Sequence, residues 1–212
     1  MDCCDPNGLD RMFAAPLVRW ELRAYRRRGL NRRQREIVAL LGPLAPETSV
    51  LDIGCGIGAL GVTLLAKGAG EGTFVDLSSA YLQAAREVAA EAGVAARAAL
   101  YRDDFATSAR PYPCADVVLL DRVVCCYPEG AALLEKAARH SRRTLVYSYP
   151  RPLWFMPLFR ALCALGMRLM GQRYRFFLHD PDALLRAATA GGGVHVATRR
   201  VGVWGLVRVS KR

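Results

Sequence analysis

The fold of this 212-residue chain is decided by a short stretch, residues 50–58, which reads VLDIGCGIG. Its first four residues are apolar except for Asp52, which is typical of a strand buried in a sheet. Gly54, Gly56 and Gly58 follow at every second position, and glycine lets the backbone turn sharply and approach a ligand closely. A helix is expected to begin directly after the last of them. A strand, a glycine-rich turn and a helix in this order predict a nucleotide-cofactor site.

Strands and helices alternate on the carboxyl side of this turn. Strands are expected at residues 50–53, 73–75, 98–101, 116–120 and 144–149, and helices at residues 58–67, 79–92 and 129–140. Two last apolar runs, residues 194–201 and 203–209, meet at Gly202 and predict an antiparallel hairpin at a sheet edge. The pattern predicts an α/β fold with a doubly wound, mostly parallel seven-stranded sheet and helices on both faces.

The rest of the chain is expected to complete one domain over residues 1–212. Helical spacing over residues 9–41, broken at Gly29, predicts N-terminal helices. The expected parts are a helical cap (1–47), a cofactor-binding core (48–150), a helical lid or insertion (151–180), and a last helix with the hairpin (181–212).

Composition narrows the class of protein. Hydrophobic residues make up 52% and charged residues 23% of the chain, which excludes extensive disorder. The formal net charge of +11 comes almost entirely from arginine and is densest at residues 23–35. A solvated helix face is favoured there over a surface for an anionic substrate or membrane headgroups. No basic motif interleaved with aromatic residues accompanies it, so no nucleic-acid partner is expected.

The start of the sequence and the spacing of the cysteines indicate the cellular compartment and whether a metal site is expected. The first residues, MDCCD, contain no apolar run, so a cytoplasmic protein without a secretory signal is expected. Cys3-Cys4 and Cys125-Cys126 are adjacent pairs without the C-x₂-C spacing of zinc sites or a histidine cluster. Buried free thiols are therefore expected, and no metal site.

Two cofactor classes compete for the glycine-rich turn. Residues 56–61, GIGALG, fit the dinucleotide fingerprint G-x-G-x-x-G, whereas residues 54–58 preceded by Asp52 fit a turn for S-adenosylmethionine (SAM). A carboxylate buried in an apolar strand needs a cationic partner. The α-ammonium of SAM would supply one, whereas a dinucleotide pyrophosphate would be repelled. Asp76, 22 positions after Gly54 at a strand end, is placed to accept hydrogen bonds from ribose hydroxyls. Together these features favour SAM over NAD.

Residues 50–58 resemble the first motif of class I SAM-dependent methyltransferases, and Asp76 resembles their ribose-binding acid. The resemblance covers residues 48–150. It implies that Asp104 binds the adenine amino group, that Phe105 and Leu77 pack on the two adenine faces, and that Asp121 ends the strand beneath the methyl donor. The expected cofactor-binding residues are therefore Asp52, Gly54, Gly56, Gly58, Asp76, Leu77, Asp104, Phe105 and Asp121.

A narrower resemblance concerns the acceptor. Residues 121–128, DRVVCCYP, and 148–151, SYPR, resemble bacterial proteins grouped near the magnesium-protoporphyrin O-methyltransferases, which methylate a propionate of a flat apolar ring. The ubiquinone-pathway O-methyltransferases are a nearby type. The resemblance implies O-methylation of a small apolar or aromatic acceptor. A non-catalytic SAM-binding protein and an RNA methyltransferase are the alternatives, the latter favoured only by the net charge.

Two residues are candidates for chemistry. Tyr127 follows the fourth expected strand, where open α/β sheets bind ligands, and either orients the acceptor or packs beneath Pro128. His179 is the first candidate for a general base, and its structural alternative is a hydrogen bond at the start of the helix near Pro181.

Residues 152–172 are rich in Trp, Phe, Leu and Met but are interrupted by prolines and arginines, so they do not predict a membrane span. A lid over the acceptor pocket and a buried core helix are equally favoured. An interfacial helix in peripheral contact with a membrane is the third interpretation.

Overall fold

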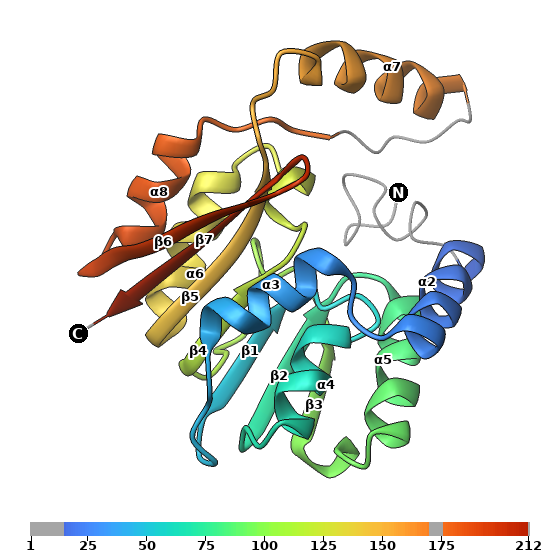
Figure 1. Cartoon of the computed structure of the whole chain (residues 1–212), viewed down its shortest axis with the longest axis vertical. Helices are drawn as coiled ribbons and strands as arrows, with labels where there is room; N and C mark the ends of the chain where they lie inside the picture. The colour runs from blue at the N-terminus through green and yellow to red at the C-terminus, as the bar shows by residue number, and fades with distance from the viewer. Residues whose placement is uncertain (1–14, 170–175, 212) are drawn as a thin grey trace.

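The computed structural model describes residues 15–169 and 176–211, in which a central sheet is covered by helices on both faces (Figure 1). The sheet has seven strands in the order β3-β2-β1-β4-β5-β7-β6. The strands are β1 (Ser49–Ile53), β2 (Glu71–Asp76), β3 (Ala98–Arg102), β4 (Ala115–Leu120), β5 (Ser141–Pro150), β6 (Gly193–Val201) and β7 (Trp204–Lys211). β1 to β5 are parallel, and β7 is antiparallel to both β5 and β6. The expected doubly wound sheet with an antiparallel C-terminal hairpin is confirmed.

The described helices are α2 (Ala15–Arg28), α3 (Arg32–Leu41), α4 (Ala59–Ala66), α5 (Ser79–Glu91), α6 (Gly130–His140), α7 (Met156–Leu169) and α8 (Pro181–Thr189), with short 3-10 turns η1 (Ala95–Arg97) and η2 (Val124–Cys126). All of these helices except α7 form two groups that bury opposite faces of the sheet. One core lies between the sheet and α2 to α5, and the other between the sheet and α6 with α8. Successive strand residues enter opposite cores: Val50 belongs to the first and Leu51 to the second.

The N-terminal helices separate where the sequence predicted. Gly29 has a φ of +65°, in the left-handed region that favours glycine, and ends α2. Asn31 then caps α3 by a reciprocal capping box with Gln34. The expected helical residues 9–14 lie outside the described residues, as do Cys3 and Cys4. Cys125 and Cys126 are buried free thiols, as expected.

The apolar segment that follows β5 does not form the buried core helix that was one of its two favoured interpretations. α7 stands apart from the layered body (Figure 1), and Met156 is its buried residue. Its leucines are exposed, so the prediction of a buried core helix is wrong for residues 156–169. Residues 170–172 of the expected segment lie outside the described residues. None of the described helices has the length and apolar content needed to cross a membrane.

Candidate functional site

The glycine-rich turn joins β1 to α4 at the carboxyl edge of the parallel strands. Gly54, Gly56 and Gly58 have φ values of +64°, +56° and +73°, so all three adopt a conformation that other residues rarely reach. A Cβ atom at Gly54 would collide with the side chain of Val123, whereas one at Gly56 would meet only the ring of Tyr81 at 3.9 Å. Gly58 forms the N-cap of α4. Glycine is therefore required by backbone conformation at each position, and at Gly54 also by space.

Asp76 connects the end of β2 to this turn. Its carboxylate accepts hydrogen bonds from the backbone N–H of Gly56 at 2.8 Å and from that of Ser78 at 2.9 Å. The glycine-rich turn and Ser78, the N-cap of α5, are thus held by the same carboxylate. A carboxylate oxygen accepts more than one hydrogen bond, so the same group can also face a ligand hydroxyl.

A cavity of about 530 Å³ opens beside the turn, within the size range of small-molecule and cofactor sites. Its wall combines the strand ends with α2 and α3. Of the expected site residues, the wall includes Asp52, Gly54, Gly56, Asp76, Leu77, Phe105, Asp121 and Tyr127. Gly58, Asp104 and His179 do not line it. The fold therefore brings most of the expected residues to one place, although they come from distant parts of the chain.

Asp52 is a buried acid at the centre of this arrangement. Its residue is 2% exposed, and its Oδ2 accepts a hydrogen bond from the Gly61 N–H at 3.1 Å. Burial raises its pKa to about 8, and the nearby carboxylates of Asp121 and Asp76 act in the same direction. A cation in the cavity would favour the ionised form. The expected contact with the α-ammonium of SAM stays a prediction.

The segment after β3 contributes two acids with different surroundings. Asp103 lines the cavity and accepts hydrogen bonds from the hydroxyls of Tyr112, at 2.8 Å, and Ser108. Burial opposes its ionisation, but these hydrogen bonds outweigh burial and lower its pKa. Asp104 instead accepts a hydrogen bond from Tyr127. The adenine role of Asp104 stays a prediction, and the cavity wall favours Asp103 as the alternative.

Phe105 and Leu77, which the sequence predicts beside an adenine ring, differ in exposure, and their adenine role stays a prediction. Phe105 is 2% exposed and packs on Tyr112, with ring centroids 5.5 Å apart. Leu77 is half-buried and packs against Cys125 and Cys126. Both side chains reach the cavity wall.

Tyr127 follows η2 and donates a hydrogen bond from its hydroxyl to Asp104 at 2.8 Å. Burial and the neighbouring Asp104 carboxylate raise its pKa. The phenol is therefore protonated at neutral pH and acts as a donor or a wall group, not as a base.

His179 is held by backbone carbonyls. Its Nε2 lies 3.0 Å from the carbonyl oxygen of Val124 and 3.0 Å from that of Tyr127. A nitrogen facing two acceptors carries the proton. This imidazole therefore anchors η2 and the following residue to the segment that precedes α8. The general-base role stays a prediction that these contacts do not support.

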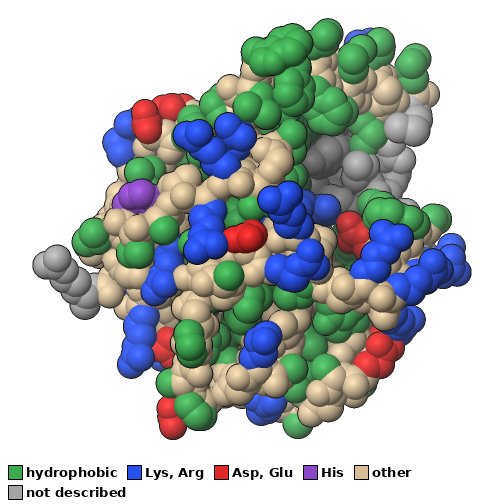
Figure 2. Space-filling view, viewed as in Figure 1, with side chains coloured by type: hydrophobic (Ala, Val, Ile, Leu, Met, Phe, Trp, Pro, Cys, Tyr) green, Lys and Arg blue, Asp and Glu red, His purple; other side chains and the backbone are tan. Residues whose placement is uncertain are grey.

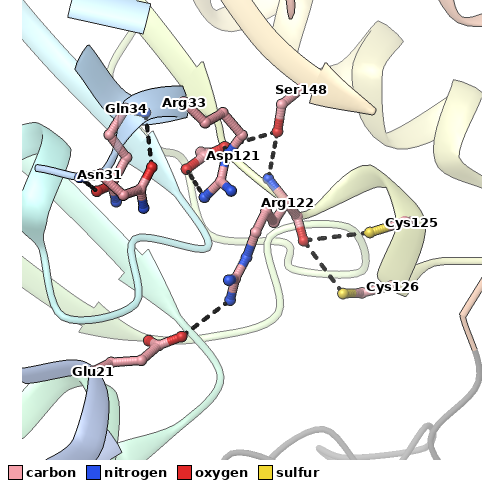
Figure 3. Close-up of polar contacts among 9 residues, drawn as sticks. All are labelled: Glu21, Asn31, Arg33, Gln34, Asp121, Arg122, Cys125, Cys126 and Ser148. Carbon is pink, nitrogen blue, oxygen red and sulfur yellow. Dashed lines mark hydrogen bonds and ion pairs between the residues drawn. The ribbon is translucent and has the colours of Figure 1, made fainter. Parts of the chain in front are cut away.

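Asp121, expected beneath the methyl donor, is the centre of a polar network (Figure 3). Arg33 donates two hydrogen bonds to its carboxylate, at 2.7 and 2.9 Å, and Ser148 donates a third at 2.8 Å. The Arg33 guanidinium also lies over the ring of Trp204, 5.2 Å from its centroid. This one arginine of α3 therefore contacts both β7 and the end of β4.

Arg122 lies two residues after the end of β4, where the chain turns toward η2. It has a φ of +64°, and its N–H donates to Ser148 while its carbonyl accepts from the thiols of Cys125 and Cys126 (Figure 3). Its side chain reaches Glu21 on α2, 3.2 Å away. Glu21 in turn accepts a hydrogen bond from Tyr81 at 2.9 Å.

The sequence did not single out Arg33, Glu21 or Tyr81, although all three line the cavity. Arg33 lay within a basic run interpreted as a solvated face, and its partner is 88 residues away. The asparagine cap before α3 was a usable signal for where this helix begins, but not for the face it buries.

Comparisons with known proteins agree with this geometry. Residues 50–144 match the family model described as a methyltransferase domain. No curated protein matches the chain at a significant level. One similar solved structure is magnesium protoporphyrin IX methyltransferase from Synechocystis PCC 6803 with bound SAH, with 18% identity over 96% of this chain and 85% of that one, and a TM-score of 0.62.

Two other solved structures share the fold, and their names mention different small molecules. An O-methyltransferase family 2 protein from Planctomyces limnophilus, in complex with apigenin, has 20% identity over 92% of this chain and 62% of that one, with a TM-score of 0.68. Geranyl diphosphate C-methyltransferase from Streptomyces coelicolor has 13% identity over 85% and 78%, with a TM-score of 0.66. Residues 50–144 thus match a methyltransferase domain, and the described chain shares the fold of solved SAM-dependent methyltransferases.

Proposed function

We propose that this protein transfers the methyl group of SAM to an oxygen atom of a small apolar or aromatic acceptor. The observation that carries the proposal is the cavity at the carboxyl edge of β1, β2 and β4, which joins the glycine-rich turn, Asp76 and buried Asp52. Bound SAM supplies an activated methyl group on its sulfonium. The protein must hold it, orient the acceptor and exclude water.

The residues present fit SAM better than a dinucleotide. Asp52 lies on the cavity wall, and its ionised form is favoured by a cation and opposed by a pyrophosphate. Gly56 leaves room for a ligand to approach the backbone, because a Cβ there would meet no atom of the described residues closer than 3.9 Å. Asp76 ends β2 on the cavity wall, which supports the proposed contact with the ribose hydroxyls of SAM.

The character of the wall supports an acceptor that already carries a negative charge. Among the described residues that line the cavity, none is a histidine. Tyr127 remains protonated because its pKa is raised. An ionised carboxylate needs no base before it accepts a methyl group, whereas a neutral phenol does. A flat molecule bearing a carboxylate therefore suits this site, and the magnesium protoporphyrin methyltransferase that shares the fold gives a first compound class to assay.

The competing functions receive less support. An RNA methyltransferase was favoured by net charge, but many arginines of the described residues are committed within the protein, including Arg26, Arg33, Arg122 and Arg199. A non-catalytic SAM-binding protein would share the cofactor site and lack turnover, so activity measurements separate it from an enzyme.

The test uses calorimetric binding of SAM and NAD, followed by methyl transfer to a panel of porphyrin, phenolic and carboxylic acceptors. SAM binding without NAD binding is expected, with turnover on at least one carboxylate. Gly56→Val should abolish SAM binding. Gly93→Val is the matched control, because Gly93 also has a positive φ, +69°, and open space but lies outside the cavity. A folded Gly56→Val variant that binds SAM normally would remove the turn from the cofactor site.

A further inference from the structure

α7 presents an apolar face to solvent. Leu158, Leu162, Leu165 and Leu169 recur at intervals of four, three and four residues, so they share one side of the helix. They are 64%, 59%, 55% and 79% exposed. Trp154, just before the helix, is 90% exposed. The space-filling view shows hydrophobic side chains gathered over this helix at the top of the molecule (Figure 2).

This face is not explained by the proposed function. No described residue of α7 lines the cavity beside the glycine-rich turn. The helix is buried only at Met156, close to its start. An exposed apolar surface of this kind marks an interaction site in a protein that must remain in water.

The charges around α7 point to the kind of partner. Residues 151–179 contain five arginines and no acidic residue. Arg160 and Arg168 lie on α7 itself and form no ion pair with any described residue. A leucine face on a helix whose remaining surface carries arginines, with tryptophan at one end, is the pattern of a helix lying in the headgroup region of an anionic bilayer.

We propose that α7 docks this protein on the surface of an anionic lipid membrane. The 14 residues of α7 extend about 21 Å, less than the roughly 30 Å hydrocarbon core, so the helix lies in the interface and does not span it. The leucines enter the acyl boundary, while Arg160 and Arg168 pair with lipid phosphates. A second copy of the chain fits less well, because two such faces would bring arginines together without any acid on either helix.

Cosedimentation with vesicles tests the proposal. Vesicles of phosphatidylcholine with an equal amount of phosphatidylglycerol are compared with vesicles of phosphatidylcholine alone. The wild-type protein should bind the mixed vesicles, and added salt should weaken binding. Replacing both arginines, Arg160→Gln with Arg168→Gln, should reduce binding to the mixed vesicles and have little effect on any residual binding to phosphatidylcholine.

A matched pair of variants isolates the leucine face. Leu162→Gln with Leu165→Gln should weaken binding by at least about tenfold, because each leucine no longer buries apolar surface in the membrane. Val194→Gln with Val196→Gln is the control: these residues are 49% and 50% exposed, but they lie on β6. The control should bind like the wild type. SAM affinity should be the same in all of these proteins, which separates this proposal from the proposed function.

Three results would overturn the membrane proposal. The first is a monomeric wild-type protein that does not bind the mixed vesicles. The second is a β6 control that loses as much binding as the leucine variant. The third is a wild-type protein that forms a dimer in aqueous buffer, does not bind vesicles and dissociates in the leucine variant, which would assign the face to a second copy.

Discussion

At the scale of single residues, the site depends on acids whose surroundings differ. Asp76 is half-buried and accepts hydrogen bonds from two backbone N–H groups, so it shapes the turn, and its contact with the ribose stays a prediction. Asp52 is buried with a single hydrogen bond from Gly61. The sequence predicted an acid at each of these strand positions. It did not predict their hydrogen bonds, because these depend on where the folded turn and α4 place their backbone N–H groups.

Removing the Asp76 carboxylate should weaken SAM binding. We expect Asp76→Ala to lower SAM affinity by at least about tenfold, since a hydrogen bond to a charged group contributes about 1.5–3 kcal/mol. Calorimetry measures the effect. Asp116→Ala is the control, because Asp116 also accepts hydrogen bonds from a backbone N–H and a hydroxyl, both of Ser49, but lies at the start of β4 away from the cavity. Equal SAM affinity in a folded Asp76→Ala protein would exclude the ribose role.

The buried carboxyl of Asp52 should make stability depend on pH. Its pKa is raised to about 8, so between about pH 4 and that value the folded state binds more protons than the unfolded state. The free energy of unfolding should therefore fall as pH rises through this window and level off above it. Asp52→Asn removes this contribution while keeping an oxygen that accepts from Gly61.

Urea unfolding at pH 5 and pH 8 measures this effect. Going from the lower to the higher pH, the stability of Asp52→Asn relative to the wild type should improve by more than about 1 kcal/mol. Parallel pH profiles for the two proteins would show that the wild-type carboxyl does not titrate in this window.

At the scale of elements, the central alternation of strands and helices was predictable because apolar runs, glycine turns and helix stops are local signals. The strand edges moved by a few residues, as with β2, which extends over Glu71–Asp76 beyond the expected residues 73–75. The packing of α3 was not predictable. It depends on the contact between Arg33 and Asp121, which are 88 residues apart, and the sequence around each residue does not indicate its partner.

The Arg33–Asp121 pair should anchor α3 to the sheet. Their side chains are 11% and 10% exposed, so Arg33→Ala leaves a nearly buried carboxylate without its cation and should cost about 3 kcal/mol of stability. The double variant with Asp121→Ala should lose less than the sum of the single losses, by more than about 1 kcal/mol. Urea unfolding gives all of these values.

A surface ion pair provides the comparison for these single and double variants. Arg26 and Glu87 are 42% and 43% exposed, so Arg26→Ala should cost much less stability than Arg33→Ala. If the effects of Arg33→Ala and Asp121→Ala simply add, the pair does not act as a unit in holding α3.

At the scale of the whole molecule, the described residues divide into a layered body and the projecting α7. The two cores on either side of the sheet include residues from all of the described helices except α7. Only the start of α7 is buried. The sequence left lid and core equally favoured because apolar composition alone does not say which surface a helix meets. The lid interpretation also remains a prediction, since the cavity wall includes no described α7 residue.

This division predicts that the apolar surface of α7 contributes little to folding. Trp154→Ala with Leu158→Ala should change the free energy of unfolding by less than about 0.5 kcal/mol, because both side chains are mostly exposed. Leu184→Ala on α8, at a fully buried position, should cost about 2–5 kcal/mol. SAM affinity should be unchanged in the α7 variant, since neither residue reaches the cavity. Urea unfolding and calorimetry provide both readings. If the α7 variant loses as much stability as Leu184→Ala, then α7 packs against the body in solution, and its apolar face belongs to the core instead of to a partner.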